Sequence, residues 1–150
     1  MTNLISDAFI QAKELVMKAM GELVADGTFP AEPVPAFNTE IPADSKNGDV
    51  STNAAMVCAR PFRNNPRKIA EAIVSKIDLN GSYFARCEVA GPGFINFFYS
   101  PEWYATVVAT VLEQKEKYGE TDLGAGKSVL VEFVSANPTG PLHIGHARGA

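Results

Sequence analysis

The sequence predicts an α+β fold in which helices pack on a small antiparallel sheet, followed by the first strand and helix start of a Rossmann-like domain. Apolar residues recur at helical spacing in three long segments, and two strand-like segments flank Gly91-Pro92-Gly93. A short apolar run at residues 128–134 precedes a turn rich in glycine and proline. With 150 residues and 46% hydrophobic content, the chain can bury one good core.

The first helix is expected over residues 4–25, and Gly27 is placed to end it. One apolar stripe runs along this helix: Leu4, Ala8, Phe9, Ala12, Leu15, Val16, Ala19 and Leu23. Residues 29–42 are rich in proline, which lacks the N–H that a helix interior or a central strand requires. This segment is therefore predicted to be extended chain or an edge strand, and residues 44–48 a turn.

Two further helices are predicted in the middle of the chain. Asp49, Ser51 and Thr52 offer N-cap oxygens for a short helix that continues through Arg60. Asn65-Pro66 is a favourable start for the next helix. Its inward residues are expected to be Ile69, Ala70, Ile73, Val74 and Ile77.

Residues 83–90 and 94–99 are predicted to form an antiparallel hairpin. Alternation along its second strand places Phe94, Asn96 and Phe98 on one face and the intervening aromatic and aliphatic residues on the other. Ser100-Pro101 then starts a helix. The apolar stripe of that helix is Trp103, Val107, Val108, Val111 and Leu112.

The expected organisation is a first domain over residues 1–112, a linker over 113–126 and the truncated start of a second domain over 127–150. The run 128–134 has the continuous apolar character of a strand buried on both faces of a parallel sheet. Pro138, Gly140 and Pro141 then break regular structure before a helix start. A strand, a turn and a helix N-terminus together favour anion binding, because free backbone N–H groups face the ligand.

His143 and His146 lie three residues apart at that helix start, so both imidazoles can reach one phosphate group. Hydrogen-bond donors held there would stabilise the charge that develops during nucleotidyl transfer. Gly145 is expected to let a ligand approach the backbone. A metal pair and two ordinary surface histidines are the alternatives, although no cysteine, carboxylate or third histidine lies nearby in sequence to complete a zinc site.

Residues 131–149, VEFVSANPTGPLHIGHARG, resemble the corresponding segment of arginyl-tRNA synthetases. Within it, residues 143–146 resemble the His-Ile-Gly-His signature of class I aminoacyl-tRNA synthetases. Residues 48–53, 66–71 and 88–97 resemble the amino-terminal tRNA-binding domain of the same family. The resemblance covers essentially the whole chain. One departure is Val50, where the family more often has an aromatic residue, and we interpret it as a change in core packing.

The resemblance implies an enzyme that activates L-arginine with ATP and transfers it to tRNA(Arg). It implies that His143, Gly145 and His146 bind ATP and that the two histidines are catalytic. In the complete enzyme, Mg²⁺ is expected to bind together with ATP, and no structural metal is expected. Glu132 and Asn137 match arginine-binding positions, with Ser135 beside them. A lone carboxylate in an apolar strand needs a cationic partner, which a guanidinium would supply; a strand-end carboxylate that reaches solvent or a lysine is the alternative.

Phe94 and Asn96 match positions that hold a protruding base of the tRNA D-loop. An aromatic ring beside an amide can stack on an unpaired base and bond its edge, whereas the alternative places Phe94 in the core. Because the formal net charge is −4, any contact with the RNA phosphates has to come from a local cluster of positively charged residues. The candidates, which could equally form an ordinary solvated loop and helix end, are Arg60, Arg63, Arg67 and Lys68.

Cys58 and Cys87 form no C-x-x-C motif and are expected to be small buried hydrophobes in a reducing compartment. No membrane span or signal peptide is recognisable, so we expect a soluble, cytoplasmic protein. We also expect the complete enzyme to be a monomer. The 150-residue chain alone is expected to be inactive, because a doubly wound site needs neighbouring strands. The alternatives are a small nucleotidyltransferase of the His-x-Gly-His type and a non-catalytic RNA-binding module.

Overall fold

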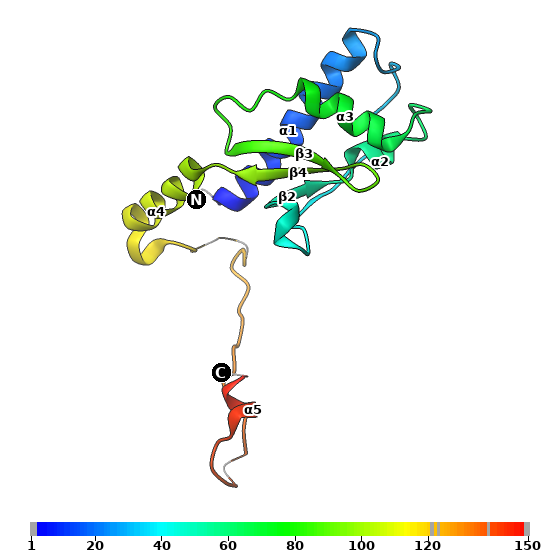
Figure 1. Cartoon of the computed structure of the whole chain (residues 1–150). Coiled ribbons are helices and arrows are strands. Elements are labelled where there is room, and N and C mark those ends of the chain that lie inside the picture. Colours follow the sequence, from blue (N-terminus) through cyan, green and yellow to red (C-terminus); the bar gives the residue numbers. More distant parts are fainter. Residues whose placement is uncertain (1–2, 121, 123, 138, 149–150) are drawn as a thin grey trace. The chain divides into compact units, whose positions relative to one another are not determined.

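The computed structural model describes residues 3–120, 122, 124–137 and 139–148. Pro138, which was predicted to lie in the turn before His143, is outside the described residues. The chain divides into two compact units, Met1–Tyr118 and Gly119–Ala150. The first unit contains the sheet and most of the helices (Figure 1).

A four-stranded antiparallel sheet in the order β1-β2-β4-β3 forms the centre of the first unit. Its strands are β1 (Thr39–Glu40), β2 (Val50–Thr52), β3 (Phe84–Ala90) and β4 (Phe94–Tyr99). The predicted hairpin is confirmed, with Ala90 opposite Phe94 and a register shift between Phe84 and Arg86. The proline-rich segment supplies β1 at the edge of the sheet, as expected.

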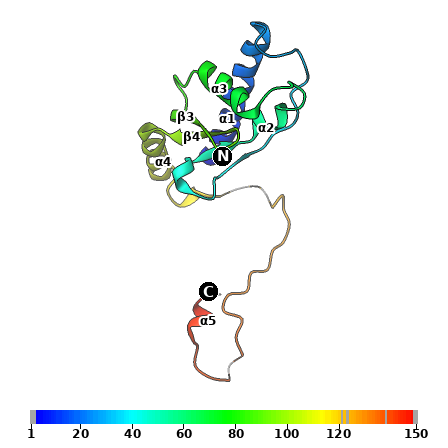
Figure 2. The ribbon, with the colours of Figure 1, turned by 45° about the vertical axis from the view of Figure 1, so that its right-hand side comes forward.

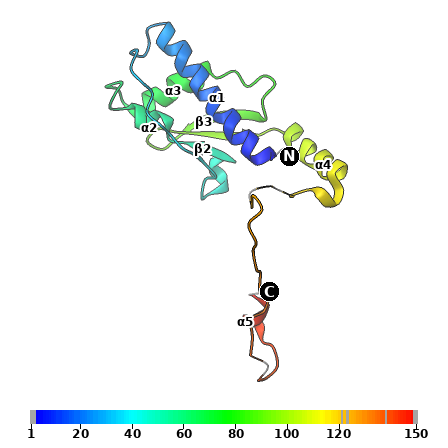
Figure 3. The same ribbon diagram turned by 180° about the vertical axis from the view of Figure 1, so that it is seen from behind.

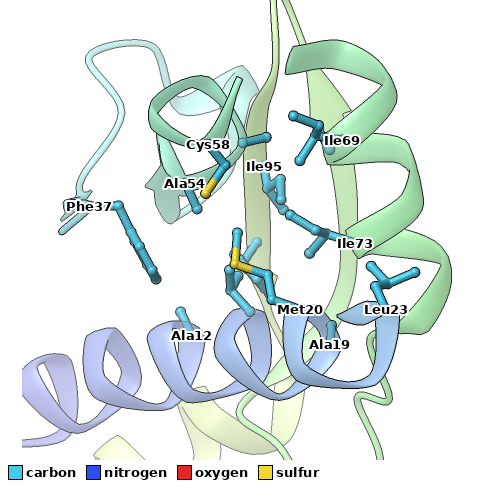
Figure 4. Packing of buried hydrophobic residues seen from close by; sticks show 14 of the residues in the cluster. Ala12, Ala19, Met20, Leu23, Phe37, Ala54, Cys58, Ile69, Ile73 and Ile95 are labelled. Carbon is cyan, nitrogen blue, oxygen red and sulfur yellow. The ribbon is translucent and has the colours of Figure 1, made fainter. Parts of the chain in front are cut away.

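Three helices cover one face of this sheet: α1 (Leu4–Ala25), α2 (Ala54–Cys58) and α3 (Pro66–Lys76). Figure 3 shows α1 crossing in front of the strands. The Asn65 side chain accepts the N–H of Arg67 and caps α3, and the helix begins at Asn65-Pro66 as predicted. Residues from α1, α3 and β4 meet in the core, as Figure 4 shows for Ala12, Met20, Leu23, Ile69, Ile73 and Ile95.

The prediction that Asp49, Ser51 and Thr52 cap a helix through Arg60 is wrong. Residues Val50–Thr52 form strand β2, Asn53 is the N-cap residue of α2, and α2 ends at Cys58. Val50 and Thr52 pair with Phe97 and Ile95 of β4, and this tertiary pairing overrides the local capping preference. Thr52 nevertheless accepts the N–H of Ala54 through Oγ1 at 3.3 Å.

Helix α4 (Pro101–Gln114) follows β4 at one end of the sheet (Figure 2). It begins where predicted, with the Ser100 hydroxyl accepting the N–H of Trp103. Trp103 is buried and stacks on Tyr99 with ring centroids 3.7 Å apart. The inward stripe is wrong beyond this first turn, because Val108 and Leu112 are 59% and 70% exposed.

Residues 128–134, predicted to be a buried strand, form no strand in the second unit. Val129, Leu130, Val131 and Phe133 are between 61% and 96% exposed, and Val134 has a φ of 48°, outside the extended region. A strand requires a neighbour to pair its N–H and C=O groups, and an apolar run cannot replace that neighbour. The start of a Rossmann-like domain therefore stays a prediction. The described helix of this unit is α5 (Ile144–Ala147).

Among the described residues, no helix combines the length and the apolar character needed to cross a membrane.

Gly48 holds the turn before β2 against β4, and its replacement tests that packing. A Cβ at Gly48 would lie 2.6 Å from the Phe97 carbonyl oxygen, whereas a Cβ at Gly81 would meet nothing within 4 Å. Both glycines have positive φ, of 89° and 72°. We expect Gly48→Ala to lower the free energy of unfolding clearly more than Gly81→Ala, for which the left-handed backbone alone costs about 1–2 kcal/mol. Urea denaturation of the two variants measures the difference, and equal losses would contradict the expected clash.

Candidate functional site

The face of the sheet opposite the helices carries the side chains that alternation predicted. Ile95 and Phe97 belong to the buried core, whereas Phe94 and Phe98 are only partly buried and lie on the other face. The strand register adds neighbours from β2 and β3 to this open face. Opposite Asn96 lie Ser51 on one side and Glu88 on the other, and Arg86 lies opposite Phe98.

A hollow of about 360 Å³ opens on this face. Its most buried lining residues are Ser51 and Asn96, which are 5% and 2% exposed and form its floor. Its other lining residues come from the end of β1 and the segment after it, and from the hairpin turn with the strand ends beside it: Glu40, Pro42, Ala43, Asn47, Ala90, Gly91 and Phe94. The structure therefore brings Phe94 and Asn96 together in one cavity.

The charges on the open face suit the edge of a base better than a phosphate. Glu40 lines the hollow, and Glu88 lies directly across from Asn96. Carboxylates repel phosphates but accept hydrogen bonds from the amino groups of bases. The guanidinium of Arg86 covers the Phe98 ring at 3.5 Å from its centroid, and its Nε lies 3.8 Å from the Glu88 carboxylate.

Of the four basic residues Arg60, Arg63, Arg67 and Lys68, Arg67 contacts a residue that lines the hollow. Its Nη1 donates to the carbonyl of Gly91, a lining residue, at 3.0 Å, and its Nε pairs with Glu71 at 3.1 Å. Close packing of Gly93 on Pro66 fixes the hairpin turn beside the start of α3. Arg60, Arg63 and Lys68 are exposed and have no carboxylate partner among the described residues.

The two thiols are free and poorly suited to nucleophilic chemistry. Burial raises the pKa of Cys58 and of Cys87 to about 11. Cys58 is fully buried, as expected, and Cys87 is partly buried. In the described part of the chain, no three side chains of His, Cys, Asp or Glu gather as metal ligands.

In the second unit, the two histidines form the start of α5. Nδ1 of His143 accepts the N–H of Gly145 at 3.1 Å, and Nδ1 of His146 accepts the N–H of His143 at 3.0 Å. An imidazole nitrogen that accepts a hydrogen bond carries no proton, so a neutral ring has its proton on Nε2. The rings lie 3.8 Å apart between centroids at an angle of 30°. Both histidines can therefore present Nε2–H donors to one ligand.

The structure gives Gly145 a role that the sequence did not suggest. A Cβ at this position would lie 2.9 Å from Cε1 and 3.0 Å from Nδ1 of His143. Glycine thus leaves room for the imidazole to fold back over the first turn of α5, a contact within the protein in addition to the predicted approach of a ligand.

The first unit matches one known family. A family model described as the arginyl tRNA synthetase N terminal domain covers residues 5–99. The chain belongs to the arginyl-tRNA synthetase family. Its relatives include the arginine–tRNA ligase of Acetivibrio thermocellus, 46% identical over 149 residues, and that of Thioalkalivibrio sulfidiphilus, 49% identical over 140 residues.

The chain is much shorter than these arginyl-tRNA synthetases. The alignments cover 99% and 93% of the chain but 26% and 24% of the two relatives, so it spans about a quarter of their length. Its fold is also similar to that of an arginyl-tRNA synthetase from Plasmodium falciparum, with a TM-score of 0.53 over 65% of this chain and 17% of that chain. At 20% identity, this similarity concerns the fold alone.

Membership of the arginyl-tRNA synthetase family confirms the resemblance, and the roles of single residues stay predictions. Glu132, Ser135 and Asn137 are all exposed. The Glu132 carboxylate reaches solvent here, because residues 128–134 lack the neighbouring strands that would bury it. No hydrogen bond joins these three side chains among the described residues.

Sequence reasoning missed four residues of the open face: Glu40, Ser51, Arg86 and Glu88. Arg86 and Glu88 could have been found by pairing the two predicted strands of the hairpin, because residues of β3 that lie opposite Asn96 and Phe98 share their face. Ser51 could not, because its place opposite Asn96 depends on β2, a strand of three residues with no visible alternation.

Proposed function

We propose that the chain is the tRNA-binding, amino-terminal portion of an enzyme that attaches L-arginine to tRNA(Arg). In the complete enzyme, the arginine carboxylate attacks the α-phosphate of ATP, and pyrophosphate leaves. The terminal ribose hydroxyl of the tRNA then attacks the carbonyl of the arginyl-adenylate, and AMP leaves. The printed names of the relatives, arginine–tRNA ligases, support this proposal.

The histidine pair is assigned to the first of these two steps. Both Nδ1 atoms accept backbone N–H groups, which leaves two Nε2–H donors for the phosphate oxygens of ATP. Donors placed in advance stabilise the charge that grows as pyrophosphate departs. Glu132, Ser135 and Asn137 are assigned to the arginine, whose guanidinium would pair with the carboxylate of Glu132.

The open face of the sheet is assigned to an unpaired base of the tRNA D-loop. The observation that carries this assignment is the hollow that places the partly exposed Phe94 ring beside the buried Asn96 amide. The ring can stack on the base while the amide bonds its edge. Arg67, which bonds the hairpin turn, and the exposed Arg60, Arg63 and Lys68 are assigned to neighbouring phosphates.

We assign the protein to the cytoplasm, where its two free thiols would stay reduced. In the complete enzyme, Mg²⁺ would accompany the phosphates of ATP, and the enzyme would act as a monomer.

Phe94→Ala tests the base site. We expect this variant to lose about 1–3 kcal/mol of binding free energy for tRNA(Arg), because the stacked ring is removed. The fold should be retained, since Phe94 lies outside the buried core. Fluorescence anisotropy with labelled tRNA(Arg) measures the affinity, and urea denaturation measures the stability. Phe94→Tyr, which keeps the ring, is the matched control and should bind like the wild type.

Two outcomes would contradict the assignment. If Phe94→Ala bound tRNA(Arg) as tightly as Phe94→Tyr, the ring would have no role in binding. If Phe94→Ala unfolded the first unit, Phe94 would belong to the core, and the RNA would bind elsewhere.

A further inference from the structure

The floor of the hollow consists of a pair of buried polar side chains that hold each other. Ser51 and Asn96 lie opposite each other on β2 and β4. The Ser51 hydroxyl donates to Oδ1 of Asn96 at 2.7 Å, and the two residues are 5% and 2% exposed. Buried polar groups of this kind restrict each other's rotation, because rotation out of contact costs both of them this hydrogen bond.

This hydrogen bond decides which end of the Asn96 amide faces the hollow. A serine hydroxyl has one proton, and Ser51 gives it to Oδ1 of Asn96. With the amide reversed, Nδ2 would donate to Ser51, and the hydroxyl proton would lose the Oδ1 acceptor that it has here. The reversed amide would also turn its oxygen outward on the face that carries Glu40 and Glu88. Both effects favour the observed orientation.

The amide nitrogen of Asn96 remains available to a ligand. It has no hydrogen-bond partner within the described residues. Yet the one fully buried side-chain nitrogen or oxygen without a partner in this part of the chain is Nε1 of Trp103. Nδ2 of Asn96 is therefore not sealed from solvent, and the cavity that Asn96 lines is the hollow.

We propose that Ser51 is a positioning residue that makes the hollow an N–H donor site, so that the bound base must present a hydrogen-bond acceptor to Asn96. An unrestrained asparagine can read a base with its oxygen and its nitrogen together, as in bidentate pairing with adenine. Here the oxygen accepts the Ser51 hydroxyl, which turns the amide nitrogen to the hollow as the group that reads the base. Glu40, on the wall, is an acceptor for a base amino or imino group. This inference rests on the proposed function of the hollow.

As a consequence, Phe94 and Ser51 contribute to two different properties, affinity and base preference, which binding experiments can measure separately. Phe94 supplies stacking, which every base tolerates, and therefore affinity for all bases alike. Ser51 acts through Asn96 and supplies discrimination. Without the hydroxyl, the Asn96 amide can rotate and present either end, so base preference should relax without an equal loss for every base.

The test uses the 150-residue chain and four tRNA(Arg) transcripts that differ only in the unpaired D-loop base. We expect Ser51→Ala to narrow the spread of Kd values across the four transcripts by about 2- to 10-fold, the range of one lost hydrogen bond. Ser51→Thr, which keeps the hydroxyl and suits a strand, should restore the wild-type spread. Phe94→Ala should weaken all four by a similar factor.

The side-chain ¹⁵N–¹H₂ resonances of Asn96 give a second readout that needs no variant. In the wild-type chain they should shift when the preferred transcript is added. If the spread of Kd values were unchanged in Ser51→Ala while Phe94→Ala bound more weakly, the role of Ser51 would be overturned and the base site would still be supported. A uniform loss in Ser51→Ala, or Asn96 resonances that ignore the RNA, would also overturn it. Undiminished binding by Phe94→Ala would instead remove the proposed function itself.

Discussion

Replacing His143 or His146 by alanine in the complete enzyme is expected to slow formation of arginyl-adenylate by about 100- to 1,000-fold. Each substitution removes one Nε2–H donor that the backbone contacts of Nδ1 hold in place. Losing a comparable preorganised donor raises an activation barrier by roughly 2.7–4 kcal/mol. The affinity for ATP should fall far less, because the donors act mainly on charge that exists only in the transition state.

His143→Asn separates catalysis from helix capping. Asparagine can accept the N–H of Gly145 as the Nδ1 atom does, and it is among the best N-cap residues, but it lacks the Nε2–H donor. Arginine-dependent ATP–pyrophosphate exchange measures adenylate formation, and equilibrium dialysis measures ATP binding. Rescue by asparagine would mean that His143 only caps α5. Equal losses in exchange and in ATP affinity would show that the histidines bind ATP without a special role in the transition state.

Phe97→Ala is expected to lower the free energy of unfolding by about 3–5 kcal/mol. Phe97 is completely buried, pairs with Cys87 and Val50 of the neighbouring strands, and contacts the Phe84 ring at 4.9 Å between centroids. Small domains have only about 5–15 kcal/mol of stability in total, so this variant should be close to unfolding at physiological temperature.

Phe94, the first residue of β4, provides the control for this prediction. Phe94→Ala removes the same side chain from the open face of the same strand, and we expect a much smaller loss of stability. Urea denaturation followed by circular dichroism gives both values. Losses of similar size in the two variants would contradict the division of β4 into a core face and an open face.

The sequence predicts those elements whose pattern is long enough to be read locally. The first helix repeats its apolar stripe over 22 residues, and the hairpin joins two alternating strands through Gly91-Pro92-Gly93. Strand β2 has three residues, all buried, so no alternation marks it, and its identity comes from pairing with β4. Residues 128–134 have a strand-like composition, but the described chain offers no partner strand.

The candidate sites follow the same rule. Alternation along one strand was enough to place Phe94 and Asn96 on the open face. Contacts between distant segments were not predictable, and they include the hydroxyl of Ser51 on Asn96 and the guanidinium of Arg67 on the Gly91 carbonyl. Helix α4 gives the simplest example of this limit of sequence-based prediction. Its apolar stripe predicts that one face is covered, but it does not identify the covering segment, and Val108 and Leu112 are exposed.

The stack of Trp103 on Tyr99 gives the chain an internal optical reporter. Trp103 is the single tryptophan of the sequence, and its ring lies 3.7 Å from that of Tyr99, where the first turn of α4 meets the end of the sheet. Indole emission therefore monitors this junction and nothing else in the protein, whereas circular dichroism is dominated by the longer helices. Coincidence of the two signals during unfolding distinguishes a helix that melts together with the sheet from one that detaches first.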